Sequence, residues 1–434
     1  MTDRTLTEQA VAPLSQRARV PPRLGALIVA SAADFELRAI EIPRETTFGR
    51  EAEADVVLPE PGISRVHLAI EPRDDGLWVK DLGSRNGTFV AGRRLGPDAE
   101  LARAGTVLRL GKTLIVVGNV APYAEPRPPP LPGLLGGAAL DDTRRRVESM
   151  AASRAPVLVL GETGTGKEVI AHALHQQSGR RGSLVALNCA ALPSELVDAE
   201  LFGHTKGAFS GAAGSRAGQF RAADGGTLFL DEIAEMPPTA QAKLLRALET
   251  QEIRAVGDDH TVKVDVRIVA ATNQSLEAMI GAGSFRADLL HRLAGFRLLL
   301  PPLRERREDV PALAAHFLAG SGVGLSTLAL ERMLEHDWPG NVRELRNAVL
   351  AAAHVAERRG QTELDAETME EFLRPIVAPR QETEAEAELR RVTEALSSAR
   401  GDVARAAEVL GTSRSVLYET LRRLGIEPRS YRKR

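Results

Sequence analysis

Cysteine is almost absent from this chain, and long apolar runs are absent altogether. The one cysteine, Cys189, excludes an intrachain disulfide and a cysteine-based zinc site. Its apolar context, VALNCAAL, predicts a small buried side chain. No apolar run reaches the ~18 residues that span a bilayer, so we expect no membrane partner. The first residues, MTDRTLTEQ, lack the pattern of a secretory signal, which predicts a cytoplasmic protein.

Net charge is also nearly absent, because 434 residues carry a formal charge of −2. The hydrophobic fraction of 43% indicates globular domains, and the length predicts two or three of them. The charge is uneven, however: residues 411–434 hold seven Lys and Arg against two Glu. A basic end on a near-neutral chain indicates a polyanionic partner, although a solvated terminus would have the same composition.

Two segments have the composition of linkers. Residues 120–132 are proline-dense, and residues 376–388 are acidic with no apolar face. We therefore predict a flexible tail over 1–22 and three domains, at 23–119, 133–375 and 389–434. The second domain is expected to end in a lid at about 306–375.

The three predicted domains differ in their sequence patterns. In the first, short β-rich runs at 26–29, 77–79 and 114–117 lie between turn residues, which predicts an all-β sandwich. The middle domain alternates apolar strands with helical patterns, which predicts an α/β fold with a parallel sheet. The last domain is helical throughout. The predicted fold class is therefore multidomain: all-β, then α/β with a helical lid, then all-α.

The middle domain contains a phosphate-binding loop, GETGTGKE. It follows the apolar strand 157–160 and opens a helical pattern, and in this context glycines let backbone N–H groups surround phosphates. Lys167 then reaches the β and γ phosphate oxygens of ATP. The predicted nucleotide contacts are Gly161, Glu162, Thr163, Gly164, Thr165, Gly166, Lys167 and Glu168.

A second apolar strand of this domain, in TLFLDE, ends in two acids. Asp231 is the predicted Mg²⁺ ligand, and Glu232 is the predicted catalytic residue that polarises the attacking water. Glu168 stands where many such loops have a serine or threonine ligand, so we expect the metal to depend on Asp231 and on water. ATP and Mg²⁺ are the predicted cofactors.

Between these two motifs lies ELFGHTKGAFSGA, at residues 200–212. It resembles the GAFTGA loop of the sigma-54-dependent transcriptional activators, a branch of the AAA+ ATPases. The resemblance implies contact with sigma-54 RNA polymerase, with Phe209 at the loop tip. Ser210 replaces the usual threonine and loses a methyl worth about 0.8 kcal/mol of apolar contact, so we expect impaired or retuned coupling rather than abolition. The implied contact residues are Gly207, Ala208, Phe209, Ser210, Gly211 and Ala212.

The same resemblance covers about 134–373 and implies roles for single polar residues. Asn188 would hold the catalytic Glu232 until the nucleotide state changes. Asn273 corresponds to the polar residue near the γ-phosphate, and Arg343 corresponds to the nucleotide-sensing arginine of the lid. Arg343 could instead simply lie on an exposed helix face.

Arg286 and Arg292 match two arginines that reach into the neighbouring subunit's active site in this family. An arginine supplied in this way contributes roughly 10³–10⁵ in rate to phosphoryl transfer. The resemblance therefore implies a homo-oligomer, from a dimer to a hexameric ring. Both residues could otherwise be solvated helix charges.

The first domain resembles the forkhead-associated (FHA) domain over about 23–119. FGR at 48–50, SRVH at 64–67 and GSRNGT at 83–88 carry the resemblance, which implies a phosphothreonine-bearing protein partner. Asn86-Gly87 alone would also suit a tight hairpin turn, and an FHA domain that binds protein without phosphate is the alternative for the whole domain. Arginine forks and hydroxyl donors suit a dianionic phosphate, and the implied contacts are Arg50, Ser64, Arg65, Arg85 and Asn86.

The last domain resembles the Fis-type helix-turn-helix. Asp402 is expected to cap a first helix through Leu410, and a second helix is expected from Ser413 to Leu424. The internal face would include Val403, Ala407 and Val416. Double-stranded DNA is the implied partner, with a dimerisation hairpin as the alternative. The implied major-groove contacts are Ser413, Arg414, Ser415 and Tyr418, and the implied phosphate contacts are Arg422 and Arg423.

Together these features predict an ATP-dependent transcriptional activator of sigma-54 RNA polymerase that responds to phosphothreonine. Two other functions are compatible with the sequence. One is a DNA-binding AAA+ regulator that lacks productive sigma-54 contact, acting as a repressor or on another polymerase form. The other is an AAA+ remodeller of other proteins, which the helix-turn-helix disfavours.

Overall fold

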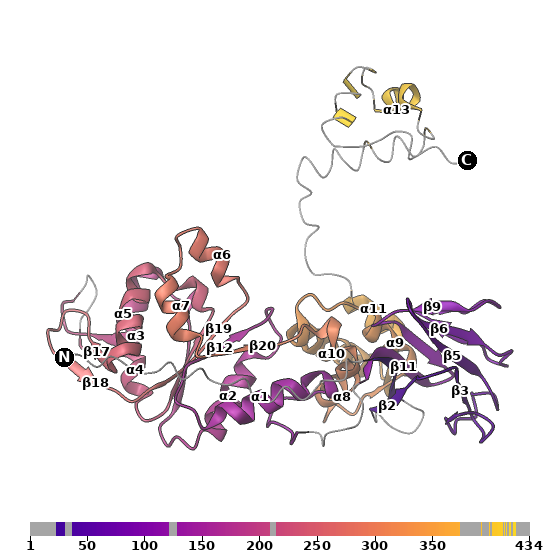
Figure 1. The fold of residues 1–434 in the computed structure, drawn as a ribbon, viewed down its shortest axis with the longest axis horizontal. Coiled ribbons are helices and arrows are strands. Elements are labelled where there is room, and N and C mark those ends of the chain that lie inside the picture. The colour runs from indigo at the N-terminus through magenta and orange to yellow at the C-terminus, as the bar shows by residue number, and fades with distance from the viewer. Residues whose placement is uncertain are drawn as a thin grey trace, which may run out of the picture. The chain divides into compact units, whose positions relative to one another are not determined.

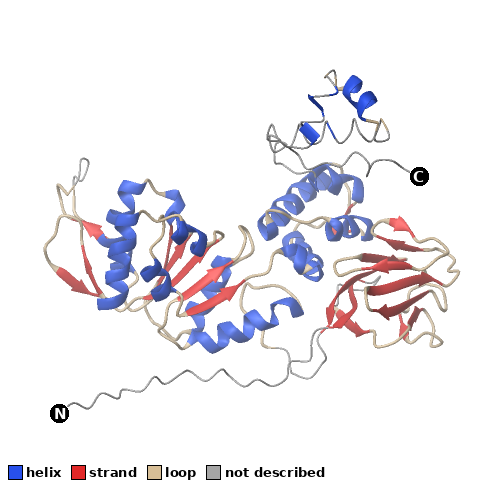
Figure 2. Cartoon of the chain, turned by 45° about the horizontal axis from the view of Figure 1, so that its top comes forward, coloured by secondary structure: helices blue, strands red, loops and turns tan. Residues whose placement is uncertain are grey.

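The computed structural model describes residues 23–30, 37–120, 128–208 and 214–373, and thereafter 392, 399, 402–410, 412, 414, 416, 417, 420 and 421. The chain divides into two compact units, Met1–Leu373 and Arg374–Arg434. The first unit contains a β-sandwich, an α/β core and a helical lid (Figure 1, Figure 2). The predicted multidomain fold class is confirmed. No helix in the described part of the chain is long and apolar enough to cross a membrane.

Two sheets form the β-sandwich. One has six strands in the order β2-β1-β11-β10-β7-β8, and the other has five in the order β4-β3-β5-β6-β9. Buried side chains that include Phe48, Leu68 and Ile115 fill the space between them. The strands are β1 Arg23–Ala30, β2 Arg38–Glu41, β3 Thr46–Gly49, β4 Val56–Val57, β5 Leu68–Arg73, β6 Gly76–Asp81, β7 Thr88–Val90, β8 Arg93–Arg94, β9 Glu100–Ala102, β10 Val107–Leu110 and β11 Thr113–Val120.

The α/β core is built on a five-stranded sheet in the order β13-β16-β19-β12-β20, and every pairing in it is parallel. Alternate residues of each strand face opposite layers, as the two-residue strand period requires. The strands are β12 Val157–Leu160, β13 Leu184–Asn188, β16 Thr227–Asp231, β19 Arg267–Thr272 and β20 Phe296–Leu299.

Helices cover both faces of this sheet. On one face, Val147 of α1 and Ile170 of α2 pack against Val159 of β12. On the other, Leu201 of α3 and Leu244 of α5 pack with Leu158. The helices of the core are η1 Ala138–Leu140, α1 Asp141–Ala151, α2 Lys167–Gln177, η2 Cys189–Ala191, α3 Ser194–Phe202, α4 Gln219–Ala222, η3 Ile233–Glu235, α5 Pro238–Thr250, α6 Leu276–Gly281 and α7 Ala287–Leu293.

Two small hairpins are inserted into the core, and both pair antiparallel. The first joins β14 Gly203–His204 to β15 Arg216–Ala217, and the second joins β17 Glu252–Arg254 to β18 Thr261–Lys263. A bridge between His204 and Val256 links the two hairpins.

The lid packs around Trp338, whose side chain is fully buried and donates its indole N–H to the carbonyl of Met333. Its amphipathic helices bury one face each, as a surface helix of a globular domain does. The elements are η4 Leu303–Glu305, η5 Arg307–Asp309, α8 Val310–Leu318, β21 Gly324–Leu325, α9 Thr327–Glu335, α10 Asn341–Arg358, β22 Glu363–Leu364 and α11 Ala366–Leu373.

The six-stranded sheet of the sandwich is apolar on both faces, and the lid covers its outer face. Leu27, Val29 and Val116 belong to the same buried cluster as the lid residues Leu330 and Trp338. The strand β11 and the helix α9 lie next to each other in this unit (Figure 1). The sandwich and the lid therefore share one hydrophobic core.

A buried ion pair crosses this contact. Arg109 on β10 donates to Glu331 on α9 at 2.8 Å, and the two side chains are 15% and 6% exposed. Its guanidinium also lies 3.8 Å from the centre of the Phe89 ring. Because a buried charge is costly without its partner, this pair favours one arrangement of sandwich and lid.

In the second unit, the described helix α13 spans Val403–Val409. Asp402 caps it, because its carboxylate accepts the backbone N–H of Ala404 at 2.8 Å, as predicted. Val403 and Ala407 are buried as expected, but Val416 is exposed, so its assignment to the internal face is wrong. Ala406, one position before Ala407, is buried in the same cluster.

Candidate functional site

The phosphate-binding loop joins strand β12 to helix α2. Gly164 and Gly166 have φ values of 80° and 109°, a conformation that favours glycine. Helix α2 has no side-chain cap at its N-terminus, and a Cβ added to Gly166 would face open space. Uncapped N–H groups at a helix start form an anion site, so this cradle fits nucleotide phosphates.

Lys167 lies inside the loop with only 7% of its surface exposed. Its ammonium donates to the carbonyl oxygens of Gly161 at 3.0 Å and Glu162 at 3.3 Å, and it lies 3.8 Å from a carboxylate oxygen of Glu232. A desolvated cation at this point attracts phosphate strongly. The P-loop lysine and the predicted catalytic carboxylate are thus close together. Glu168, by contrast, is exposed on α2.

Two neighbouring strands bring the acids and Asn188 together. Asn188 ends β13 and lies in register with Asp231 at the end of β16. The next residue, Glu232, has φ 50° and ψ 51°, and its N–H donates to the carboxylate of Asp231 at 3.1 Å. Left-handed backbone at a residue other than glycine stores strain of order 1–3 kcal/mol and is common at active sites. The side chain of Asn188 accepts the N–H of Ala190.

Cys189 follows Asn188 and is 2% exposed. Burial raises the pKa of its thiol to about 12, and the negative charges of Asp231, Glu232 and Glu235 add to the shift. The expected small buried residue is therefore found. Its thiol packs in the hydrophobic core near Asp231 and Glu232.

Asn273 follows β19 and contacts the phosphate-binding loop directly. Its side-chain amide donates to the hydroxyl of Thr163 at 2.9 Å. This places the predicted γ-phosphate sensor beside the loop. A second loop threonine, Thr165, is 1% exposed and donates to the carbonyl of Glu162 at 2.8 Å.

The lid holds the phosphate-binding loop through residues that sequence patterns did not single out. Arg304 donates two hydrogen bonds to Glu162, at 2.9 and 2.6 Å. Asn341, the first residue of α10, donates to Glu162 at 3.1 Å and to the carbonyl of Thr163 at 3.0 Å. These bonds, that of Arg304 first, hold the pKa of Glu162 below its usual range.

Arg343 lies on the first turn of α10 and is exposed. A Cβ built on Gly164 would be 3.1 Å from the Cβ of Arg343, and the N–H of Val342 donates to the carbonyl of Gly164 at 3.0 Å. The predicted lid arginine therefore stands directly over the loop.

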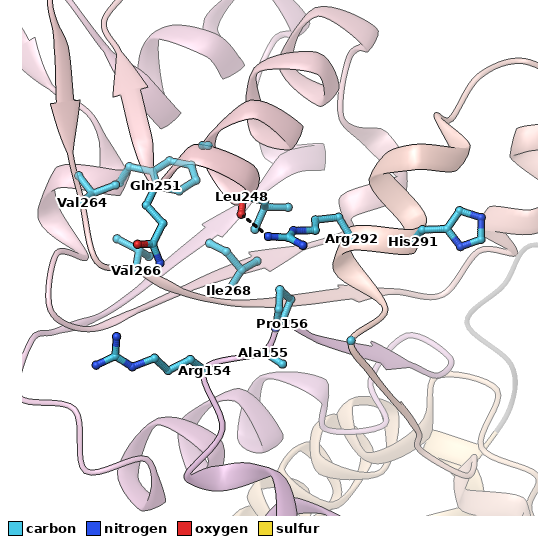
Figure 3. A pocket seen from close by; sticks show the side chains of 13 residues that line it. Arg154, Ala155, Pro156, Leu248, Gln251, Val264, Val266, Ile268, His291 and Arg292 are labelled. Atoms are coloured by element: carbon cyan, nitrogen blue, oxygen red, sulfur yellow. Dashed lines mark hydrogen bonds between the residues drawn. The ribbon is translucent and has the colours of Figure 1, made fainter. Parts of the chain in front are cut away.

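Arg286 directly precedes α7, Arg292 lies in its last turn, and the partners of both lie outside the phosphate-binding loop. Arg286 forms a bidentate pair with Asp288, at 3.0 and 2.7 Å, and is 48% exposed. Arg292 donates to the carbonyl of Leu248 at 3.2 Å and lines a cavity of about 400 Å³ together with Arg154 (Figure 3). The two arginines thus lie at opposite ends of α7.

The GAFSGA segment lies between β14 and β15. Of its residues, Gly207 and Ala208 are described, whereas Phe209, Ser210, Gly211 and Ala212 lie outside the described residues. The stem is held from the side, because the N–H of Thr205 donates to the carbonyl of Val256 at 3.0 Å. The β17–β18 hairpin is therefore a support for this loop, which its sequence did not reveal.

The predicted phosphopeptide residues lie on three adjoining loops of the sandwich. Ser64 accepts the N–H of Arg85 at 3.0 Å, and Asn86 donates to the carbonyl of Gly62 at 2.7 Å. Arg50 is 40% exposed beside Glu51, and Arg65 is also exposed. These contacts bring Arg50, Arg65, Arg85 and the hydroxyl of Ser64 to the same end of the sandwich.

His67 ties these loops together beneath the surface. It is fully buried, its Nδ1 accepts the N–H of Ser64 at 3.1 Å, and its Nε2 therefore carries the hydrogen that points to the carbonyl of Gly87 at 3.3 Å. Burial lowers the pKa of His67, so the neutral ring is favoured. His67 therefore has a structural role beneath these loops.

Of the predicted DNA contacts, only Arg414 belongs to the described residues, and it is exposed in a helical position. Ser413, Ser415, Tyr418, Arg422 and Arg423 lie outside the described residues. No group of three His, Cys, Asp or Glu side chains that could hold a metal ion occurs within the described ranges.

Four family models match successive parts of the chain. The sigma-54 interaction domain matches residues 135–299, and the FHA domain matches 46–111. The AAA+ ATPase lid domain matches 304–386, and the model described as bacterial regulatory protein, Fis family, matches 384–424.

Curated relatives and solved structures agree with these matches. Regulatory protein AtoC of Escherichia coli (strain K12) is 42% identical over 315 residues, which cover 68% of each chain. DNA-binding transcriptional activator HyfR of the same organism is also 42% identical over 315 residues, covering 67% of this chain and 47% of HyfR. The crystal structure of NtrX from Brucella abortus in complex with ATP has a TM-score of 0.51 at 34% identity, covering 68% of this chain and 69% of that one.

The fold and the nucleotide site together define an AAA+ ATPase domain that follows an FHA domain and precedes a Fis-type helix-turn-helix. The chain spans about half the length of HyfR and two thirds of AtoC. It belongs to the sigma-54-dependent transcriptional activators.

Proposed function

We propose that this chain is an ATP-driven activator that remodels sigma-54 RNA polymerase for open-complex formation. The observation that carries the proposal is the position of the stem of the GAFSGA segment. This stem, β14–β15, belongs to the same α/β core that holds the phosphate-binding loop, and the β17–β18 hairpin braces it. A loop placed in this way can move relative to the core when the nucleotide state changes.

The residues of the nucleotide site have distinct roles in this proposal. Lys167 and the N–H groups at the start of α2 would bind the phosphates, and Asp231 would hold Mg²⁺, which would neutralise phosphate charge. Glu232 orients the attacking water and accepts its proton. Asn188, in register with Asp231, restrains Glu232, and Asn273 positions the loop through its bond to Thr163.

Arg286 and Arg292 act on a neighbouring copy in this proposal, because neither is bonded to the phosphate-binding loop of its own chain. Their placement makes hydrolysis depend on assembly, up to a hexameric ring. The second unit would bind double-stranded DNA upstream of the promoter, and the exposed Arg414 lies on its reading helix.

The FHA domain would control the nucleotide site through the hydrophobic core that it shares with the lid. A phosphothreonine-bearing protein would bind through Arg50, Ser64 and Arg65, which lie on loops away from the strand face that the lid covers. The lid in turn holds the phosphate-binding loop through Arg304 and Asn341. Phosphopeptide binding can therefore alter the nucleotide site through contacts within one unit.

Transcription from purified components tests the proposal. With ATP, the chain should convert closed complexes of sigma-54 RNA polymerase to open complexes, and it should fail with a nonhydrolysable analogue. Binding to promoter DNA and ATP hydrolysis without open complexes would overturn it.

Ser210 favours one second candidate, a DNA-binding AAA+ regulator without productive sigma-54 contact, because it departs from the family's threonine. In that case transcription with polymerase lacking sigma-54 would respond to the chain.

A further inference from the structure

Gln241 is a fully buried amide on α5 that neither motif nor spacing assigns to the reaction. Its Oε1 accepts the backbone N–H of Arg286 at 2.9 Å. Its Nε2 donates to the carbonyl oxygens of Met236 at 2.9 Å and Ser284 at 3.0 Å. One acceptor faces a donor and two N–H groups face acceptors, so the amide orientation is unambiguous.

These bonds join two functional segments of the core. Met236 closes the turn that begins at Glu232, since its N–H donates to the carbonyl of Ile233 and the N–H of Glu235 donates to that of Glu232. Ser284 and Arg286 form the approach to α7, where Arg286 is the residue before the first helical position. A single side chain therefore connects the backbone around the catalytic carboxylate to the backbone of Arg286.

The side chain of Arg286 is not fixed by burial. It is 48% exposed, and its visible partner is Asp288, two residues along the chain. The position of the guanidinium therefore depends on the backbone of Arg286, and the backbone N–H of Arg286 donates to Gln241. A displacement of about 1 Å in a positioning contact costs on the order of 10²-fold in rate. Loss of this bond should therefore slow any reaction in which Arg286 takes part.

We propose that Gln241 is a positioning residue that aims Arg286 at the nucleotide of the neighbouring subunit and links it to the Glu232 turn of its own subunit. The inference rests on the proposed function, in which Arg286 acts on a neighbouring copy. No other side chain of similar length offers one acceptor and two donors. Glutamate keeps an acceptor and loses at least one donor, and methionine loses all three bonds.

The test uses the full chain and measures ATP turnover of mixed rings. Gln241→Met alone should lose about 10²-fold in turnover while it keeps its affinity for ATP and remains folded, with a lower melting temperature because three buried backbone groups lose their partner. Gln241→Glu should fall between wild type and Gln241→Met. If both variants fail to fold or to bind ATP, the role is structural and the inference is overturned.

Subunit mixing separates the two sites that Gln241 touches. Subunits of Gln241→Met keep an intact active site, so Glu232→Gln subunits, which supply an intact arginine, should restore turnover at intermediate ratios. Mixing with Arg286→Ala subunits should restore nothing, because every arginine is then displaced or missing. The reverse pattern, rescue by Arg286→Ala but not by Glu232→Gln, would show that Gln241 acts on its own active site and would overturn the inference.

A control mixture distinguishes this inference from the proposed function. Arg286→Ala mixed with Glu232→Gln should regain turnover by the same logic. Absence of that rescue would refute the trans role of Arg286, and the inference on Gln241 with it. Rescue in the control without rescue of Gln241→Met would refute the inference on Gln241 alone.

Discussion

Glu232 combines a left-handed backbone with a carboxylate 3.8 Å from the P-loop lysine. The strain is of the kind that persists where the surrounding structure overdetermines a conformation. Here the end of β16 and the turn of η3 fix the residue on both sides. The position of this carboxylate is thus set by the fold before nucleotide binds.

Glu232→Gln should therefore keep ATP binding and lose turnover. Glutamine has nearly the same shape, so the phosphate cradle survives, but it cannot accept a proton from water. We expect at least a hundredfold loss in hydrolysis rate, roughly the lower bound of general-base catalysis. Fluorescent ATP-analogue titration beside a phosphate-release assay measures both, and hydrolysis within tenfold of wild type would refute the role.

The burial of Cys189 leads to a prediction about the reactivity of its thiol. With its pKa raised to about 12 by burial and nearby carboxylates, the thiol stays protonated at pH 8, where an unfolded cysteine near 8.5 is partly ionised. Its contribution to stability is full below the unfolded pKa and is lost as the pH rises toward 12. A disulfide reagent at pH 8 should react at least tenfold more slowly with native than with guanidinium-unfolded protein. Equal rates would contradict the burial.

Motifs predicted the residues of the phosphate-binding loop but not the residues that hold it. Arg304 and Asn341 contact Glu162 from positions far along the chain, and no local period relates them. Gln241 was missed for the same reason, since its partner Arg286 lies 45 residues away. Catalytic and binding residues can therefore be recognised from motifs more readily than the residues that position them.

The next scale is the element, and the GAFSGA loop is the one whose sequence departs from its family. Ser210→Thr should leave ATP hydrolysis unchanged and should raise, or leave equal, open-complex formation. The added methyl is worth about 0.8 kcal/mol, or about fourfold in contact affinity. Promoter-opening assays with potassium permanganate measure it. A fall in open complexes with unchanged hydrolysis would show that serine suits this chain's partner better than threonine does.

The β17–β18 hairpin should influence the same loop from the side. Gly257 has φ 81°, and a Cβ added to it would lie 2.6 Å from the hydroxyl of Thr205 in the loop stem. Gly257→Ala should thus cost about 1–2 kcal/mol locally and reduce open-complex formation several-fold while hydrolysis persists. Gly360→Ala is a matched control, because Gly360 has φ 68° with open space around the added Cβ. Equal effects of the two substitutions would mean that the hairpin does not support the loop.

At the scale of the whole molecule, the order of domain types follows from the sequence, but the shared core of sandwich and lid does not. The run TLIVVGNV in β11 is apolar on successive residues, which is typical of a strand buried on both faces. That signal was present, and it indicated that the outer face of the sheet is covered. The apolar run does not reveal which element covers that face, because the hydrophobic effect is non-directional and does not specify a partner.

The buried pair Arg109–Glu331 makes this contact testable. Glu331→Leu leaves Arg109 without its partner in a site where only 15% of its side chain is exposed, and breaking a buried pair costs about 3–5 kcal/mol. We expect a melting temperature several degrees lower and a nucleotide site that no longer responds to the FHA domain. A phosphothreonine peptide that alters ATP hydrolysis of the wild type should therefore bind the variant with unchanged affinity and leave its hydrolysis unaltered.

The double variant Arg109→Met/Glu331→Leu sharpens this prediction, because replacing both charges with apolar groups can restore stability. The double variant should recover the melting temperature of the wild type. If packing between sandwich and lid is enough to couple the two sites, the peptide should again alter ATP hydrolysis. If the charged pair itself is needed, the melting temperature should recover but the peptide should leave hydrolysis unaltered. Arg93→Met is the matched control, since Arg93 pairs with Glu100 in a solvent-exposed part of the same sandwich and exposed pairs contribute little to stability. A peptide effect that persists at full size in Glu331→Leu would show that the FHA domain does not act through the lid.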